Sequence, residues 1–204
     1  MRSKALMMCL SFCLFFSFSL QAQQQKLLVL GDSLSAGYGV TQEQAWVTLL
    51  QNAWKSDNIQ VVNAAISGDT TAGGLARLPA LLKQEKPSHL LLELGGNDGL
   101  QGYPVAEMKS NLASMIELAR TQNVKVILQQ MQIPTNYGKR YTQMFMAVYP
   151  ELAEQYDVPL LPFLLQEVAL NPDLMQKDGI HPNAKAQPMI LKFMQTHLKP
   201  LLSQ

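Results

Sequence analysis

The sequence has 204 residues, of which 48% are hydrophobic and 15% are charged. This composition excludes a disordered chain, and the length suits one domain with its own hydrophobic core. A formal net charge of +1 lacks the basic excess that nucleic-acid binding requires, so we expect no nucleic-acid partner. No heptad pattern or repeated unit occurs, which excludes fibrous and solenoid folds.

The first 22 residues have the composition of a secretory signal peptide. Arg2 and Lys4 supply a basic start, an uncharged apolar stretch follows, and the small Ala22 offers a cleavage site. A membrane anchor would need about 20 apolar residues, and this stretch is shorter and interrupted by serines. We expect residues 1–22 to be removed and residues 23–204 to form one exported domain, periplasmic or secreted, without a membrane span.

Both cysteines, Cys9 and Cys13, lie inside this leader. The mature chain would therefore contain no thiol, which excludes a cysteine nucleophile and a cysteine metal site. The Gly-rich stretches lack the dinucleotide spacing and the phosphate-loop lysine. We expect no cofactor and no bound metal.

Five short apolar runs predict buried strands, and longer amphipathic segments between them predict helices. In chain order the strands are residues 27–30, 59–62, 89–94, 124–128 and 158–161. The helices are residues 41–54, a segment around 75–82, 105–122, 139–156 and 183 to about 198. Pro159 inside the last run is typical of a short edge strand.

Three helix boundaries carry specific expectations. Thr41 and Gln44 form a capping box that predicts the start of the first helix. Pro79 is expected near the start of the second helix. Asn183 is expected to cap the last helix, and Pro188 to bend it by removing a backbone hydrogen bond.

The alternation of strands and helices predicts an α/β domain in which a five-stranded parallel sheet lies between helical layers, a three-layer α/β/α sandwich. Ligands of such sheets bind beyond the carboxyl ends of the strands. Polar residues follow several of these ends. Ser33 comes after the first strand, Gly68 after the second and Asn97 after the third, while Asp178 and His181 stand late in the chain.

Asp178 and His181 are three residues apart around a glycine turn, so the carboxylate can fold back onto the imidazole and fix its tautomer. A base held in this way needs a nucleophile, and the hydroxyl of Ser33 at a strand end is the candidate. An oxyanion formed by its attack needs donors. The Ser33 amide, the Gly68 amide and the Asn97 side chain are available. Taken singly, each residue also fits a cap, a turn or a surface position.

These residues closely resemble the motif blocks of the SGNH or GDSL hydrolase superfamily. The blocks are Gly31-Asp32-Ser33-Leu34, the Gly68 segment, Gly96-Asn97-Asp98 and Asp178-Gly179-Ile180-His181. The resemblance implies a flavodoxin-like sandwich and metal-free hydrolysis of acyl esters and thioesters. It also implies Ser33 as nucleophile, His181 as general base and acid, Asp178 as the orienting carboxylate, and Ser33, Gly68 and Asn97 as the oxyanion hole.

The resemblance implies a small-molecule acyl ester or thioester as substrate, and we expect a monomer. A carbohydrate O-acetyl esterase with the same triad and a non-catalytic binding module remain as alternatives. Gly73 and Gly74 suggest a hinge for a closing loop. An apolar set after the fourth strand fits an acyl groove or, equally, a helix packed on the core. Its members are Met131, Ile133, Pro134, Tyr137, Tyr141, Met144 and Phe145.

Overall fold

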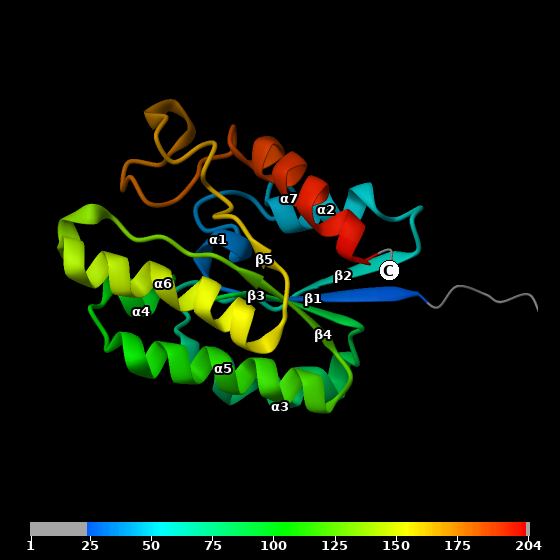
Figure 1. Cartoon of the computed structure of the whole chain (residues 1–204). Helices are drawn as coiled ribbons and strands as arrows, with labels where there is room; N and C mark the ends of the chain where they lie inside the picture. The colour runs from blue at the N-terminus through cyan, green and yellow to red at the C-terminus, as the bar shows by residue number, and fades with distance from the viewer. Residues whose placement is uncertain (1–23, 203–204) are drawn as a thin grey trace, which may run out of the picture.

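A computed structural model describes residues 24–202 (Figure 1). The predicted leader, residues 1–22, lies outside the described residues. Five parallel strands form one sheet in the order β2-β1-β3-β4-β5. The strands are β1 (Gln25–Gly31), β2 (Ile59–Asn63), β3 (His89–Glu93), β4 (Lys125–Gln129) and β5 (Leu160–Leu161).

Helices cover both faces of this sheet, which confirms the predicted three-layer α/β/α sandwich (Figure 1). One face carries α2 (Trp46–Ala53) and α7 (Gln187–Leu202), which pack against each other. The other face carries α3 (Thr71–Glu85), α5 (Val105–Thr121) and α6 (Lys139–Tyr156). Two short helices follow the carboxyl ends of central strands: α1 (Ser33–Ala36) after β1 and α4 (Gly96–Leu100) after β3.

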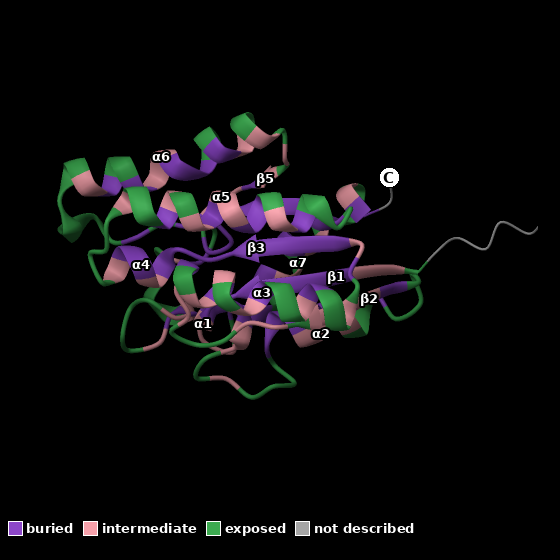
Figure 2. Ribbon diagram, turned by 90° about the horizontal axis from the view of Figure 1, so that it is seen from below, coloured by how far each residue is buried: buried purple, intermediate pink, exposed green. Residues whose placement is uncertain are grey.

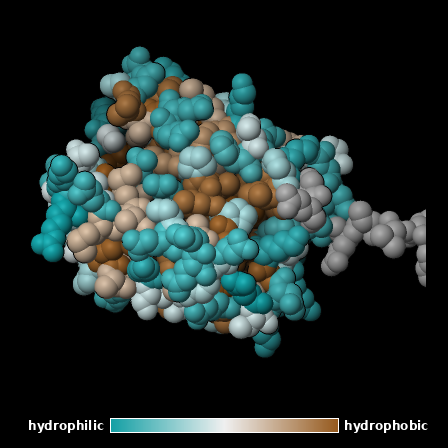
Figure 3. All heavy atoms as spheres, viewed as in Figure 1, coloured by the Kyte–Doolittle hydropathy of each residue, from teal (hydrophilic) through white to brown (hydrophobic). Residues whose placement is uncertain are grey.

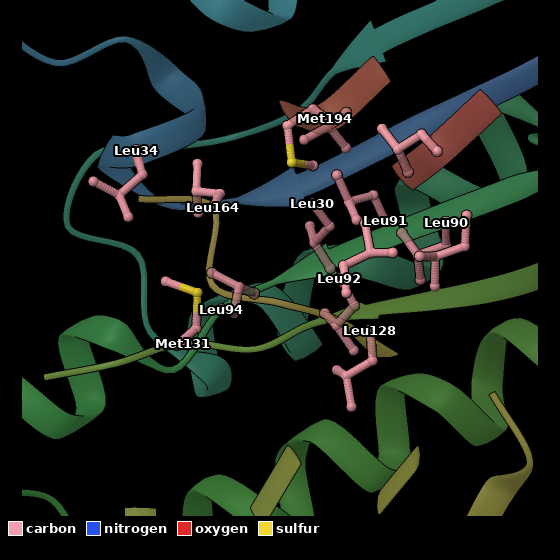
Figure 4. Close-up of a cluster of buried hydrophobic side chains, with 14 of the residues drawn as sticks. Leu30, Leu34, Leu90, Leu91, Leu92, Leu94, Leu128, Met131, Leu164 and Met194 are labelled. Atoms are coloured by element: carbon pink, nitrogen blue, oxygen red, sulfur yellow. The ribbon is translucent and has the colours of Figure 1, made fainter. Parts of the chain in front are cut away.

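The core lies on both faces of the two central strands, β1 and β3. Leu27 to Leu30 and Leu90 to Leu92 are fully buried, as expected for strands that read as continuous apolar runs. Figure 2 shows both strands as buried along most of their length. In Figure 4 the leucines of β3 lie among Leu30, Leu128 and Met194, which joins the sheet to α7.

The edge strand β5 is only two residues long because prolines flank it. Pro159 and Pro162 have no backbone N–H to donate, as expected for an edge position. The carbonyl groups of this segment still pair with β4, since Leu128 N donates to Pro159 O at 2.9 Å and Gln130 N donates to Leu161 O at 3.0 Å. On the side of the molecule seen in Figure 3, apolar residues gather in the middle of the surface, between α6 and α7.

Within residues 24–202, none of the helices has the length and apolar composition needed to cross a membrane.

The first predicted helix begins later than its sequence pattern suggested. The structure places its start at Trp46 and not at Thr41. Half of the capping box forms, because Thr41 N donates to Gln44 Oε1 at 3.2 Å, but it closes a turn that precedes the helix. The buried side chain of Gln187 accepts a hydrogen bond from Trp46 N at 3.0 Å. A residue 141 positions away therefore satisfies the amide that a local cap would have served.

The boundaries expected from Asn183, Pro188 and Pro79 were also wrong. The last helix begins at Gln187, so Pro188 lies in the first turn, where no intrahelical donor is needed and no bend follows. Asn183 Oδ1 instead accepts from Lys185 N at 2.9 Å in the preceding turn. Thr70 caps α3 by accepting from Gly73 N at 3.3 Å, which leaves Pro79 in the middle of that helix.

The proposed glycine hinge is also wrong, because Gly73 and Gly74 lie in the first turn of α3. Gly74 packs against Leu94, and a β-carbon at Gly74 would overlap the Leu94 side chain. Gly74 therefore allows α3 to pack closely on the residue that follows β3, and the pair does not form a flexible loop.

Replacing the fully buried Leu91 with alanine should lower the free energy of unfolding by about 3 kcal/mol, because the substitution leaves a cavity in the centre of the sheet. Urea denaturation followed by circular dichroism measures this change. Leu170→Ala is the control, since Leu170 is 96% exposed and its loss should change stability by less than about 0.5 kcal/mol. Equal effects at the two positions would contradict the assignment of the core.

Candidate active site

One cavity of about 430 Å³ lies at the carboxyl ends of the strands. Ser33, Asn97 and His181 line it, brought together from α1, α4 and the segment between β5 and α7. In Figure 1, α1, α4 and the segment between β5 and α7 all lie in the left half of the molecule. Residues that are up to 148 positions apart in sequence thus share one site.

Ser33, His181 and Asp178 form a continuous series of hydrogen bonds. Ser33 Oγ lies 2.9 Å from His181 Nε2, and His181 Nδ1 lies 2.8 Å from Asp178 Oδ2. The other carboxylate oxygen of Asp178 accepts from the backbone amides of Ile180 at 2.9 Å and His181 at 3.0 Å. Burial alone would raise the pKa of Asp178, but these hydrogen bonds from His181 and Ile180 lower it to about 2. Asp178 is therefore an anion beside the imidazole at neutral pH.

The turn that carries Ser33 is built by its neighbours. Ser33 is the first residue of α1, and Asp32 caps this helix by accepting from Leu34 N at 3.0 Å. Gly37 ends the helix with φ of 78°, a left-handed conformation that glycine adopts without strain. The Ser33 side chain is thereby presented at the end of β1, toward the cavity.

Hydrogen bonds of Gln176 link the segment that carries His181 to the segment that follows Ser33. Its side-chain amide donates to Tyr38 O at 2.7 Å and to Pro182 O at 3.1 Å, and its backbone N donates to His181 O at 2.8 Å. The rings of Tyr38 and His181 are also in contact, with centroids 4.5 Å apart. Sequence reasoning missed Gln176, because a half-exposed glutamine in a loop carries no pattern.

Asn97 and Gly68 lie on neighbouring segments. Asn97 Nδ2 donates to Asp69 O at 2.9 Å and lies 3.4 Å from Asp32 Oδ2. Gly68 occupies an exposed turn with φ of 82°, and a β-carbon there would meet nothing within 4 Å. Arg77 holds this turn through an ion pair with Asp69 at 2.7 Å. The Asn97 contact to Asp69 thus joins the Gly68 turn to the start of α4.

The apolar residues after the fourth strand were expected either to line an acyl groove or to pack a helix on the core, and the structure shows some of each. Met131, Ile133 and Pro134 line the cavity, whereas Phe145 is fully buried in the core. Tyr137, Tyr141 and Met144 line a separate surface depression. Most of the remaining apolar wall comes from the segment after β5, which sequence reasoning left without a role. Its members are Phe163, Leu165, Ala169, Leu170, Met175 and Ile180. The unbroken apolar stretch of residues 163–165 was the available signal.

The other two histidines lie outside this cavity. His89 is 2% exposed, with Nδ1 2.9 Å from Ser88 Oγ, and burial together with the charge of Lys125 lowers its pKa to about 4. His197 Nδ1 lies 2.8 Å from Phe193 O in α7. Across residues 24–202, no group of three or more histidines, cysteines and carboxylates is arranged to hold a metal ion.

Two buried acids lie next to the site: Asp98, which belongs to the Gly96-Asn97-Asp98 block, and Glu93, which sequence reasoning left without a role. Asp98 accepts from the Thr71 amide at 2.9 Å and from the Thr71 hydroxyl at 2.5 Å, which fixes the start of α3 to α4. Glu93 at the end of β3 is 1% exposed and accepts from Ser35 Oγ at 2.6 Å. A charged residue at the end of an otherwise apolar strand was the only signal for Glu93.

A serine, an imidazole and a carboxylate in hydrogen-bonded succession, at the carboxyl edge of a parallel sheet, are the groups of a serine hydrolase. The sequence profile of the GDSL-like Lipase/Acylhydrolase family matches residues 29–187, and the chain belongs to this family.

Several proteins resemble the chain over nearly its whole length. Thioesterase 1/protease 1/lysophospholipase L1 of Escherichia coli (strain K12) is 50% identical over 182 residues, which is 89% of this chain and 87% of that protein. Esterase TesA of Pseudomonas aeruginosa is 49% identical over 204 residues, covering 99% and 100%. The psychrotrophic esterase EstA from Pseudoalteromonas sp., in a structure inhibited by monoethylphosphonate, has a TM-score of 0.85 and 43% identity, with 88% and 100% covered.

The carboxyl ¹³C resonance of Asp178 should titrate near pH 2, below the ordinary value for aspartate of about 4. Because the folded state lowers this pKa, the resulting stabilisation is present above pH of about 4 and is lost as the pH falls toward 2. His181→Ala should raise the pKa, since it removes the ring that contacts Oδ2. His197→Ala is the matched control and should leave it unchanged. An unaltered titration in His181→Ala would contradict the assignment.

Proposed function

We propose that the protein is a serine esterase and thioesterase that hydrolyses acyl esters and acyl thioesters through Ser33, His181 and Asp178. The observation that carries this proposal is the unbroken hydrogen-bond series from the hydroxyl to the imidazole to the carboxylate. The relatives named as thioesterase, lysophospholipase and esterase support this substrate class. The phosphonate-inhibited relative supports a mechanism based on a nucleophilic side chain.

In the first step, Ser33 Oγ attacks the acyl carbonyl carbon while His181 Nε2 accepts the hydroxyl proton. The imidazole becomes a cation, and the adjacent carboxylate of Asp178 stabilises it. The two backbone hydrogen bonds to Asp178 keep that carboxylate oriented toward Nδ1. Since the distances of 2.9 Å and 2.8 Å are already those of hydrogen bonds, little rearrangement is needed for proton transfer.

The negative charge that develops on the carbonyl oxygen requires donors aimed at it. We assign this role to the Ser33 amide, the Gly68 amide and the Asn97 side chain. Asn97 Nδ2 has two hydrogens. One donates to Asp69 O at 2.9 Å, and the other, whose contact with Asp32 Oδ2 is long at 3.4 Å, is the one that we assign to the oxyanion. Gly68 has an exposed backbone that an oxygen can approach closely.

Collapse of the tetrahedral intermediate expels the alcohol or thiol, which takes the proton from His181 and leaves the acyl group on Ser33. A water molecule then attacks the acyl-enzyme while His181 accepts its proton. The second collapse releases the carboxylic acid and returns the proton to Ser33. Formation and hydrolysis of the acyl-enzyme therefore use the same residues.

The walls of the cavity favour an acyl chain over a polar sugar. Ile133, Phe163, Leu165 and Met175 present hydrocarbon surface beside Ser33, as expected of a site for an apolar chain. This observation favours acyl esters and thioesters over the carbohydrate O-acetyl esterase alternative. The continuous triad geometry likewise favours an enzyme over a binding module, which would not need an aligned proton acceptor.

Further aspects of the proposal rest on the sequence. We propose that residues 1–22 direct export and that residues 23–204 are the mature enzyme, because the leader combines a basic start, an apolar stretch and Ala22. Periplasmic or secreted location follows from that signal. We also propose that the mature enzyme acts as a monomer, because a single chain supplies the complete series of Ser33, His181 and Asp178.

Ser33→Ala should lower kcat/KM for a chromogenic acyl ester roughly 10³-fold or more, because the nucleophile is removed. Ser56→Ala is the control, since Ser56 is exposed and its hydroxyl donates to the neighbouring Asp57. An organophosphonate should add one stoichiometric mass increment to the wild type and none to Ser33→Ala. Activity of Ser33→Ala near the wild-type level would overturn the proposed mechanism.

Ala169→Trp should narrow the apolar part of the cavity, because Ala169 lines it and indole is much larger than a methyl group. We expect kcat/KM for long-chain acyl esters to fall about 10-fold or more while that for acetyl esters changes little. A rate profile over acyl lengths measures the effect. Ala80→Trp, at an exposed position on α3, is the control. A uniform loss at all chain lengths would contradict the assignment of this wall to the acyl chain.

A further inference from the structure

Two carboxyl groups are buried together beneath the nucleophile. Asp32 is 3% exposed and Glu93 is 1% exposed. They come from neighbouring strands, since Gly31 at the end of β1 is in register with Glu93 at the end of β3. Within residues 24–202, neither forms an ion pair with lysine, arginine or histidine. The energetic cost of burying two acids without a cation is high, so their arrangement requires an explanation.

Glu93 contacts both sides of the residue that carries the nucleophilic hydroxyl. Its Oε2 accepts from Ser35 Oγ at 2.6 Å and from Asp32 N at 3.3 Å, the residues two after and one before Ser33. The backbone leaves room for this carboxyl because position 31 is glycine. A β-carbon at Gly31 would overlap Glu93 Oε2. The close approach of β1 and the Glu93 side chain is therefore built into the packing.

Asp32 in turn contacts the helix that begins with Ser33 and the side chain of Asn97. Its Oδ1 accepts from Leu34 N at 3.0 Å and caps α1, while its Oδ2 lies 3.4 Å from Asn97 Nδ2. The charge of Asp32 also interacts with His181. One carboxylate thus contacts the helix that begins with Ser33 and the side chain assigned to the oxyanion.

Two neighbouring carboxyls in a buried site favour a state in which one of them keeps its proton, because two negative charges would repel each other there. Burial and the charge of Asp32 hold the pKa of Glu93 well above its usual range, and burial raises the pKa of Asp32 to about 6. At neutral pH Glu93 is then the neutral acid and Asp32 the carboxylate.

Other titratable groups lie near Asp32 and Glu93. Asp69 follows β2, Asp98 belongs to α4 and Tyr149 belongs to α6. Burial raises the pKa of Asp98 and that of Tyr149, whose hydroxyl donates to Leu94 O at 3.0 Å. His181 is engaged with Ser33 and Asp178.

We propose that Glu93 is a positioning residue for acyl hydrolysis, a neutral carboxylic acid that holds the Asp32 carboxylate and the Ser33 turn in their reactive arrangement. The inference rests on the proposed function of Ser33 and deepens it. Loss of the Glu93 proton at alkaline pH places two negative charges in the buried pair and displaces the turn. Glu93 therefore sets the alkaline limit of activity.

The test compares Glu93→Gln with Glu93→Leu in the full-length mature protein. Glutamine keeps a neutral polar side chain of the same shape with an oxygen that can accept, and it does not ionise, whereas leucine keeps volume without an acceptor. We expect Glu93→Gln to retain kcat within about 5-fold and to extend activity to higher pH. We expect Glu93→Leu to lower kcat about 10- to 100-fold with KM little changed, because the reacting groups are misplaced.

The measurement is kcat and KM for a short-chain acyl ester from pH 5 to pH 10, with thermal unfolding of each variant followed in parallel. The matched controls are Glu154→Gln and Glu154→Leu, at an exposed position on α6, and neither should change the profile. If Glu93→Leu does not unfold cooperatively, the pH profile of Glu93→Gln alone decides. The labelling rate of Ser33 by an organophosphonate reports nucleophile reactivity independently of turnover.

Three outcomes would overturn the proposal. They are a Glu93→Leu enzyme within twofold of the wild type at every pH, a Glu93→Gln enzyme as impaired as Glu93→Leu, and a Glu93→Gln enzyme with the wild-type alkaline limit. Failure of the proposed function looks different, since in that case phosphonate does not label Ser33 in the wild type and Ser33→Ala remains active.

Discussion

The parallel pairing of β1 with β3 is the constraint on which the rest of the structure depends. It sets Gly31 opposite Glu93 at the carboxyl edge, so that the turns after the two strands begin side by side. One turn carries Ser33, and the other carries Asn97. Each strand is buried on both faces, so a register shift would expose apolar residues and separate the two turns. The strand register that packs the core is therefore also the register that places the two turns of the site side by side.

Much of the fold could be predicted from the sequence because its strands are continuous apolar runs. Residues 27–30, 59–62 and 124–128 nearly match β1, β2 and β4, and the proline at position 159 identified the edge strand. Helix starts were harder to predict. The start at Trp46 depends on Gln187, whose contribution arises only after α2 and α7 have packed together. A local capping pattern cannot contain that information.

The residues of the candidate site also differ in how well the sequence predicts them. Asp178 and His181 are close in sequence, so a turn between them was enough to predict a hydrogen bond between their side chains. Glu93 and Gln176 have no such local pattern, because Ser35 lies 58 positions from Glu93 and Tyr38 lies 138 positions from Gln176. The acyl wall from residues 163–180 was missed for a related reason. Its apolar residues follow no helical or strand period, and only the folded path of this segment shows that they face the cavity.

The short sequence distance between Asp178 and His181 has a mechanical consequence. Acid and imidazole belong to one hairpin segment, whose own backbone amides bind the carboxylate and whose ends Gln176 joins to Tyr38 and Pro182. If this segment is displaced, the two side chains travel together as a rigid unit and their mutual alignment survives. Only the separation between Nε2 and Oγ changes. The hydrogen bonds of Gln176 to Tyr38 and Pro182 therefore help to set the distance on which proton transfer from Ser33 to His181 depends.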